Sequence, residues 1–159
     1  MPKKFPSHGY CFVCGDENPR GIGASLWVDD DDNTVFTDIV FTREQQGPPG
    51  HAHGGAQAAV LDEVMGMSAW WNGYKVLSVH LEVDYKRPVP LGIEVRISGR
   101  VTSAEGEKVY TEGEIVLPDG TVASVGRGIY VNSPDAIQYF LEKVGADAMV
   151  YPEMFRKLR

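Results

Sequence analysis

The sequence predicts an α+β domain in which one antiparallel sheet wraps around a single long central helix. Two short strand patterns come first, one unusually apolar helical segment follows, and four longer strand patterns come after it. A helix that is apolar on all sides has to be covered on all sides, and a curved sheet provides that cover. Its length of 159 residues suits one domain with a sizeable core, so residues 1–159 are expected to form a single domain.

The part of the chain before the helix predicts an irregular start and one hairpin. Residues 1–20 are rich in Pro, Gly and polar side chains and are expected to form an irregular lead-in. "IGASLWVDD" and "TVFTDIVFT" then indicate two short strands, joined by a turn with four consecutive aspartates. These aspartates lack the alternating ligand positions and the glycine of a calcium loop, so we expect solvated charge there. The Pro- and Gly-rich "REQQGPPGHAHGG" is a loop.

Residues 56–71, "AQAAVLDEVMGMSAWW", form the predicted helix. Only four of these residues are polar, and two of the four are the adjacent acids Asp62 and Glu63. Because a surface helix shows a polar stripe, this helix is expected to be buried on most sides. Gly66 interrupts it and predicts close packing against another backbone.

The second half of the chain predicts four long strands and a short helix. "LSVHLEVDY" and "IEVRISGRV" alternate apolar and polar residues, as in strands with one buried face. "KVYTEGEIVL" and "TVASVGRGIYV" follow, joined by the turn sequence "PDG". Ser133 and Pro134 are typical of a helix start, so residues 133–159 are expected to form a C-terminal helix and tail. The sheet edges invite pairing with another copy of the chain.

Composition excludes several classes of function. The net charge of −7 argues against a nucleic-acid partner, which would call for a basic patch. No apolar run approaches the roughly 18–20 residues of a membrane span, so no membrane partner is expected. "MPKKFPSHGY" has no apolar segment typical of a signal peptide, and the expected location is the cytoplasm.

The two cysteines lie in "CFVCG", a spacing that suits a redox pair or half of a zinc site. His8 lies three residues before Cys11 and is a possible third ligand. A structural zinc site has four ligands, however, and the chain has no second cysteine pair beside Cys11 and Cys14. The sequence therefore favours a turn without a metal, and metal or redox use is the alternative.

Three motifs resemble a known family. "HGG", with an Asp at the tenth position counted from His53, is similar to the hotdog-fold acyl-CoA thioesterases of the phenylacetate-pathway type. "DYKRPVPLG" and "CFVCGDENPRGIG" resemble a related branch of the thioesterase superfamily with a Cys-rich N-terminal motif. The resemblance runs from about Cys11 to Val131. It implies dimers that join their sheets edge to edge and often pair into tetramers, with active sites at the dimer interface.

The resemblance also implies a reaction, the hydrolysis of an acyl-CoA substrate by water without a cofactor. Asp62 takes the place of the family's catalytic carboxylate, as nucleophile or general base. The Gly55 amide at the helix start takes the place of the donor to the thioester oxygen, where unpaired N–H groups carry partial positive charge. His53 would orient the thioester or hold the loop, and Ser78 would position water from the partner subunit. Each also has an ordinary structural interpretation, as a satisfied acid, a loop-structuring His or a solvated strand residue.

Five further residues are expected to bind the substrate. Gly54 lets the thioester approach the helix closely. Glu63 is expected to pair with a cation or face a subunit interface, because helix neighbours point about 100° apart. The coenzyme A phosphates would be held by three cations, although most such cations are merely solvated. The three are Lys86, Arg87 and Arg127.

Two other functions remain open on the same fold. The first is a non-catalytic module that binds or senses acyl-CoA, and the second is a dehydratase acting on a hydroxyacyl thioester. Asp62 in the catalytic position argues against the first. The second would place a catalytic His in a motif that the sequence lacks. The acyl group stays undetermined, because pocket depth depends on packing across a subunit interface.

Overall fold

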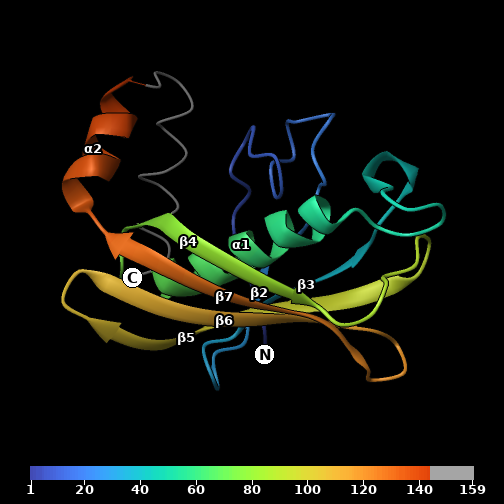
Figure 1. The fold of residues 1–159 in the computed structure, drawn as a ribbon. Coiled ribbons are helices and arrows are strands. Elements are labelled where there is room, and N and C mark those ends of the chain that lie inside the picture. The colour runs from blue at the N-terminus through green and yellow to red at the C-terminus, as the bar shows by residue number, and fades with distance from the viewer. Residues whose placement is uncertain (144–159) are drawn as a thin grey trace.

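The computed structural model describes residues 1–143, and residues 144–159 of the predicted tail lie outside this range. One seven-stranded antiparallel sheet curves around the long helix α1 (Gly54–Trp71), which lies against one of its faces (Figure 1). The predicted α+β architecture is thereby confirmed. The strands follow one another across the sheet in the order β1-β2-β3-β5-β6-β7-β4.

The strand bounds agree closely with the sequence in the second half of the chain. The strands are β1 (Lys3–Lys4), β2 (Trp27–Val28), β3 (Val35–Val40), β4 (Val76–Tyr85), β5 (Glu94–Glu105), β6 (Lys108–Val116) and β7 (Val122–Asn132). A short 3-10 helix, η1 (Arg43–Gln45), lies in the loop before α1, and α2 (Pro134–Lys143) follows β7.

The first twenty residues are less irregular than expected. Lys3 and Lys4 form the edge strand β1, which pairs with Trp27 and Val28 of β2. β2 itself is only two residues long, much shorter than its apolar pattern suggested. The predicted hairpin between β2 and β3 is present, with Trp27 opposite Phe36.

Helix α1 is covered on all sides, as its composition predicts. None of its residues from Ala56 to Trp71 is exposed, and eight of its side chains are buried. These eight are Gln57, Val60, Leu61, Val64, Met65, Met67, Ser68 and Ala69. The helix starts two residues earlier than expected, at Gly54, because His53 caps it.

A row of three glycines lets the helix approach the sheet. Gly99, Gly113 and Gly126 are direct neighbours across β5, β6 and β7. A Cβ at Gly99 would lie 2.7 Å from the Met65 nitrogen and 2.8 Å from the Val64 carbonyl carbon. Real Cβ atoms do not approach backbone atoms this closely, so only glycine permits this separation of helix and sheet.

Gly66 also makes room, though not for a backbone. A Cβ at Gly66 would lie 3.3 Å from the ring of Tyr130 on β7. The expectation that another backbone packs there is therefore wrong, and the neighbour is an aromatic side chain. This ring lies close to Asp62, so the glycine also affects the candidate site.

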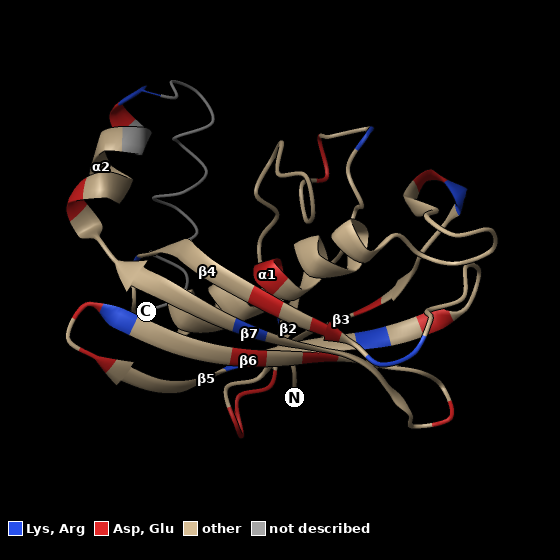
Figure 2. Cartoon of the chain, in the orientation of Figure 1, with Lys and Arg blue, Asp and Glu red and all other residues tan. Residues whose placement is uncertain are grey.

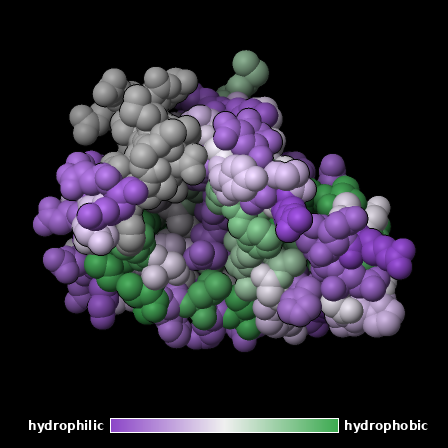
Figure 3. Space-filling model, turned by 90° about the horizontal axis from the view of Figure 1, so that it is seen from above, coloured by the Kyte–Doolittle hydropathy of each residue, from purple (hydrophilic) through white to green (hydrophobic). Residues whose placement is uncertain are grey.

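β4 is the last strand of the sheet, and within residues 1–143 nothing pairs with its outer edge. A β-bulge shifts its register against β7 between Ser78 and His80. The predicted alternation is therefore broken at Val79, which is 59% exposed. Tyr85, at the other end of the strand, is 52% exposed. Figure 3 views the molecule from above, so its lower border is the side that faces the viewer in Figure 1. Apolar side chains are exposed along this border.

Charges of both signs are spread over the strands (Figure 2). Asp38 of β3 and Arg96 of β5 form a bidentate pair at 2.8 and 2.6 Å. Arg100 of β5 donates from two of its nitrogens to a single carboxylate oxygen of Glu112 on β6. Such exposed pairs stabilise a fold only slightly, by about 0–1 kcal/mol each. No helix within residues 1–143 is long and apolar enough to span a bilayer.

Candidate active site

His53 is the N-cap residue of α1. His53 has an extended backbone and accepts a hydrogen bond on Nδ1 from the Gly55 amide at 2.8 Å. The phenol of Tyr85 donates to the Gly54 carbonyl at 2.7 Å, which fixes the end of β4 beside the helix start. His53 is exposed and, as predicted for a loop-structuring residue, holds local backbone. The Gly55 amide is therefore already engaged, whereas no hydrogen bond described for residues 1–143 uses the Gly54 amide.

A cavity of about 380 Å³ opens next to this cap. It is lined by Gly54, Gln57 and Tyr85 and by the predicted phosphate-binding residues Lys86 and Arg87. Both of these cations are exposed, and both of their backbone amides donate to the Ala123 carbonyl. The structure therefore brings the glycine and two of the three predicted cations to one opening.

Arg127 lies elsewhere. Its guanidinium donates to Glu82 at 3.1 Å and to Asp84 at 3.0 Å, both on β4. Two carboxylates around one guanidinium leave a net negative charge that opposes binding of a phosphate. Arg127 is thus a weaker phosphate candidate than Lys86 or Arg87.

Sequence reasoning missed Gln57, a buried polar residue one turn into α1. Its side-chain nitrogen donates to the Ala52 carbonyl at 3.3 Å, and its oxygen accepts from the Ser124 hydroxyl at 2.7 Å. These bonds link the helix start to β7 and to the loop before the helix. Its position among apolar helix residues was the available signal, since a buried amide needs partners.

The carboxylate of Asp62 is held by a tyrosine. The Tyr130 hydroxyl, on β7, lies 2.7 Å from Oδ1 of Asp62 and 2.9 Å from its carbonyl oxygen. Burial of the ring and the negative charge of Asp62 raise the pKa of Tyr130, so its hydroxyl stays a hydrogen-bond donor. Asp62 is half-buried, and the hydrogen bond from Tyr130 fixes the orientation of its carboxylate.

Tyr130 also was not among the predicted site residues. A Cβ at Gly128 would lie 2.6 Å from its ring, and Gly66 makes room on the helix side. The sequence signal is the glycine pattern itself, since Gly126, Gly128 and Tyr130 share one face of β7. Small residues on a core-facing strand indicate that something large lies above them.

Ser78 reaches the same part of the molecule. It lies opposite Tyr130 in the register of β4 and β7, just before the bulge. Directly opposite residues of an antiparallel pair project to the same face, so Ser78 is on the side of the sheet that carries α1. Asp62, Tyr130 and Ser78 form one half of the candidate site.

The two halves are separated along the helix. Gly55 and Asp62 are seven residues apart, which corresponds to a rise of about 10 Å and nearly two full turns. Both therefore lie on one face of α1, but a single thioester carbonyl cannot contact the amide and the carboxylate of the same chain. This separation bears on how a complete site is assembled.

Glu63 points to neither half. One of its carboxylate oxygens lies 2.8 Å from Cys14 Sγ, 3.6 Å from Cys11 Sγ and 3.3 Å from His8 Nδ1. Burial alone would lower the pKa of His8, but hydrogen bonds to Cys11 and Glu63 raise it to about 9. The expected pairing of Glu63 with a cation is thus found, with His8 as partner. A hydrogen bond from Cys14 lowers the pKa of Cys11 to about 3.

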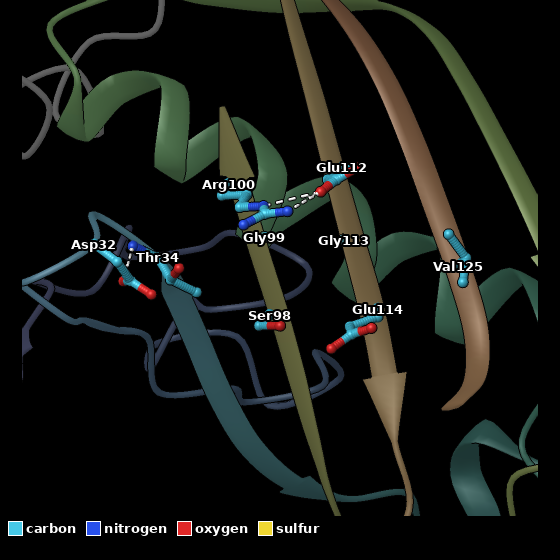
Figure 4. A pocket seen from close by; sticks show the side chains of 9 residues that line it. All are labelled: Asp32, Thr34, Ser98, Gly99, Arg100, Glu112, Gly113, Glu114 and Val125. Atoms are coloured by element: carbon cyan, nitrogen blue, oxygen red, sulfur yellow. Dashed lines mark hydrogen bonds and ion pairs between the residues drawn. The ribbon is translucent and has the colours of Figure 1, made fainter. Parts of the chain in front are cut away.

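A second hollow, of about 420 Å³, lies over the strands (Figure 4). Ser98, Arg100 and Glu114 line it, and they alternate with residues that face α1, so the hollow is on the opposite face of the sheet. Its arginine is paired with Glu112. None of the predicted site residues lines it, and its charged side chains offer little to an acyl chain.

Comparison with known proteins gives the context of these two halves. Residues 49–124 match the model of the thioesterase superfamily. A Xenopus laevis acyl-coenzyme A thioesterase, THEM4, is 43% identical over 77 residues, which are 48% of this chain and 35% of that protein. The Bos taurus THEM4 is 27% identical over 126 residues, which are 79% of this chain and 52% of that protein. The chain thus spans about half or less of the length of these relatives.

Solved structures agree on the fold. The crystal structure of a thioesterase superfamily protein superposes with a TM-score of 0.74 at 34% identity, covering 77% of this chain and 60% of that one. A Streptococcus mutans protein bound to acetyl-CoA superposes with a TM-score of 0.64 at 14% identity, covering 69% of this chain and 88% of that one. The chain therefore has the hotdog fold, and its residues 49–124 match the thioesterase superfamily.

Proposed function

We propose that this chain is an acyl-CoA thioesterase that hydrolyses an acyl-CoA to the free acid and coenzyme A. One observation carries the proposal. The capped helix start and Asp62 share a face of α1, within the segment that matches the thioesterase superfamily. Relatives named acyl-coenzyme A thioesterases and a similar fold bound to acetyl-CoA support the substrate class. A location in the cytoplasm stays a prediction from the sequence.

In this proposal the helix start polarises the thioester carbonyl. An N–H group there donates a hydrogen bond to the thioester oxygen and stabilises the negative charge that develops on it as the carbon is attacked. Gly55 was the expected donor, yet its amide donates to His53 and would have to leave it. The Gly54 amide has no such engagement among the described hydrogen bonds and is the more available donor. The Lys86 and Arg87 side chains at the adjacent cavity would then bind phosphates of coenzyme A.

Asp62 supplies the attack in this proposal. It either adds to the carbonyl carbon and expels the thiolate, which leaves an anhydride that water then hydrolyses, or it removes a proton from a water that attacks the carbon and breaks the carbon–sulfur bond. On both routes a proton from the water ends on the thiolate, which departs as the thiol. Tyr130 positions the carboxylate through its hydrogen bond, and Ser78 lies on the same side to hold water.

The gap of about 10 Å along α1 favours a site shared by two chains. Among residues 1–143 the outer edge of β4 has no partner strand. Two copies that pair these edges antiparallel about a twofold axis would place the Ser78 end of one beside the Tyr85 end of the other. The helix start of one subunit would thereby approach Asp62 of its partner. We infer a homodimer, or a tetramer of such dimers, as the active form.

The first test is thiol release from a panel of acyl-CoAs. Asp62→Asn should lower kcat by at least about 100-fold, and Asp31→Asn, in the exposed turn before β3, is the matched control. A wild type that binds acyl-CoA without releasing thiol would replace the hydrolase with the binding or sensing module. A fully active Asp62→Asn would make Asp62 a structural acid.

Proline at position 54 separates the two candidate donors. His53 has φ −63° and ψ 138°, which suits a residue before proline, and proline is tolerated at the first helical position. Gly54→Pro therefore removes one N–H and keeps the helix, but it also adds a Cβ that would lie 3.2 Å from the Tyr85 ring. Gly54→Ala adds the same Cβ and keeps the N–H, so it is the matched control. A loss of about 100- to 1,000-fold in kcat relative to Gly54→Ala would identify the Gly54 amide as the donor, and activity equal to that of Gly54→Ala would return the role to Gly55.

Mixed oligomers test the shared site. Co-expressed Asp62→Asn and Gly54→Pro chains would form mixed dimers with one intact site, built from the Asp62 of one chain and the Gly54 of the other. Activity should rise well above that of either variant alone. Mixed dimers as inactive as both parents would show that each site lies within one chain.

A further inference from the structure

Four side chains of metal-binding type meet where the N-terminal segment crosses α1. His8, Cys11 and Cys14 come from the N-terminal segment, and Glu63 comes from the helix, some fifty residues further on. One donor atom from each lies within 4.8 Å of the other three. We propose that these four side chains bind one Zn²⁺ ion.

The spacing of the donor atoms is close to that of a tetrahedral site. Zinc bonds of about 2.3 Å to sulfur and about 2.0 Å to nitrogen or oxygen place neighbouring ligand atoms roughly 3.3–3.8 Å apart. The Glu63 oxygen lies 3.3 Å from His8 Nδ1 and 3.6 Å from Cys11 Sγ, within this range. Cys14 Sγ is closer, at 2.8 Å from Glu63 and 2.9 Å from His8 Nδ1. An outward shift of roughly 0.5–1 Å at this sulfur would bring both of these distances into the same range.

The donor set selects zinc among common metal ions. Two thiolates and an imidazole favour Zn²⁺ over the hard cations Mg²⁺ and Ca²⁺, which take oxygen ligands. The donors are also shielded from water: the side chains of His8 and Glu63 are 7% and 16% exposed, and Cys14 is 7% exposed. Such a group of polar side chains is costly to bury unless a partner compensates it, and a dication would offset two of the three negative charges of the thiolates and the carboxylate.

The turn that carries the sulfurs has the shape of a binding loop. The Val13 amide donates to Cys11 Sγ at 3.4 Å, and the Gly15 amide donates to the Cys11 carbonyl at 3.0 Å. A Cβ at Gly15 would clash with the backbone of Cys11 and Gly9, so only glycine closes this turn. The loop therefore holds both sulfurs and the imidazole together before a metal arrives.

With four protein ligands the site is closed, which is the pattern of structural rather than catalytic zinc. The ion would join the N-terminal segment to α1 at the residue next to Asp62. This inference does not depend on the proposed thioesterase activity, because it rests on ligand geometry alone. The sequence alone favoured a turn without metal, because it did not reveal a fourth ligand. We propose that Glu63 is that ligand.

The test is the metal content of the full chain, purified from zinc-supplemented medium without chelator. We expect close to one zinc per chain by mass spectrometry. Replacement by Co²⁺ should give the visible bands of tetrahedral cobalt and a thiolate charge-transfer band. Glu63→Gln should weaken zinc binding by about 100-fold or more, since loss of even an outer-shell partner costs 10- to 100-fold.

Two variants complete the design. Cys14→Ser should lose both zinc and the cobalt–thiolate band, whereas Glu17→Gln, at an exposed acid of the same segment, should keep both. If Cys14→Ser does not fold, Glu63→Gln still decides, because it keeps the shape of the side chain. A zinc-free wild type without cobalt bands, or a folded Glu63→Gln with unchanged affinity, would overturn the four-ligand site. So would a Cys11–Cys14 disulfide in protein that binds no zinc.

Discussion

Alanine at position 99 tests whether the glycine row sets the depth of α1. The new Cβ would lie 2.7, 2.8 and 2.9 Å from the Met65 nitrogen, the Val64 carbonyl carbon and the Met65 Cα. Ordinary contacts begin near 3.4 Å, so the helix backbone has to move by about 0.7 Å against a packed core. Overpacking of this kind costs about 1–3 kcal/mol. For a chain of 159 residues this lowers Tm by roughly 2–12 °C.

The matched control is Gly126→Ala, in the same row. Its Cβ would meet the terminal methyl of Met65 at 3.1 Å, and a flexible side-chain end yields more easily than a backbone. Urea and thermal unfolding at equal protein concentration should therefore rank wild type, Gly126→Ala and Gly99→Ala in falling stability. Equal losses for both variants, or a stabilised Gly99→Ala, would refute the reasoning that close backbone contact requires the glycine.

Two further predictions concern hydrogen bonds of charged groups. Tyr130→Phe removes the bond to the Asp62 carboxylate, so kcat should fall about 10- to 100-fold with little change in KM, and an unchanged kcat would remove Tyr130 from the site. The hydrogen bonds from Arg96 lower the pKa of Asp38 below 3.8, so this pair stabilises the fold above that pH and its contribution is lost as the carboxylate protonates in acid. Asp38→Asn should therefore lower the free energy of unfolding by up to about 1 kcal/mol at pH 7, and the difference from wild type should shrink as the pH falls below 3.8. A difference independent of pH would contradict this reasoning.

The fold was largely predictable because its strongest signal is unambiguous. A helical segment without a polar stripe can only be a covered helix, and the period-two strands after it run to the observed ends of β4–β7 within a few residues. The features that the sequence did not predict are confined to two short segments. β1 consists of Lys3 and Lys4, which have no apolar pattern, and the bulge at Val79 shows only once β4 is aligned with β7.

The sequence predicted those residues of the candidate site that lie close together along the chain. His53, Gly54 and Asp62 belong to one helix and one motif, so spacing alone relates them. Tyr130 and the ligands around Glu63 depend on contacts between residues 49–68 positions apart, and no periodicity reports such contacts. The adjacent acids are the clearest case, since Asp62 turns to Tyr130 and Glu63 turns to the cysteines.

Helix α1 is fixed at two points, by His53 at its first turn and by Glu63 ten residues later. Insertion of one residue between them would rotate every later side chain by 100° and shift it by about 1.5 Å, so that Asp62 and Glu63 could not both keep their partners. This stretch should therefore reject any change of length, while the exposed turn at Asp29–Asn33 should accept one. Tags, linkers or grafted loops belong in that turn, and variation of substrate range is best sought by exchanging side chains around the cavity without altering the length of the helix.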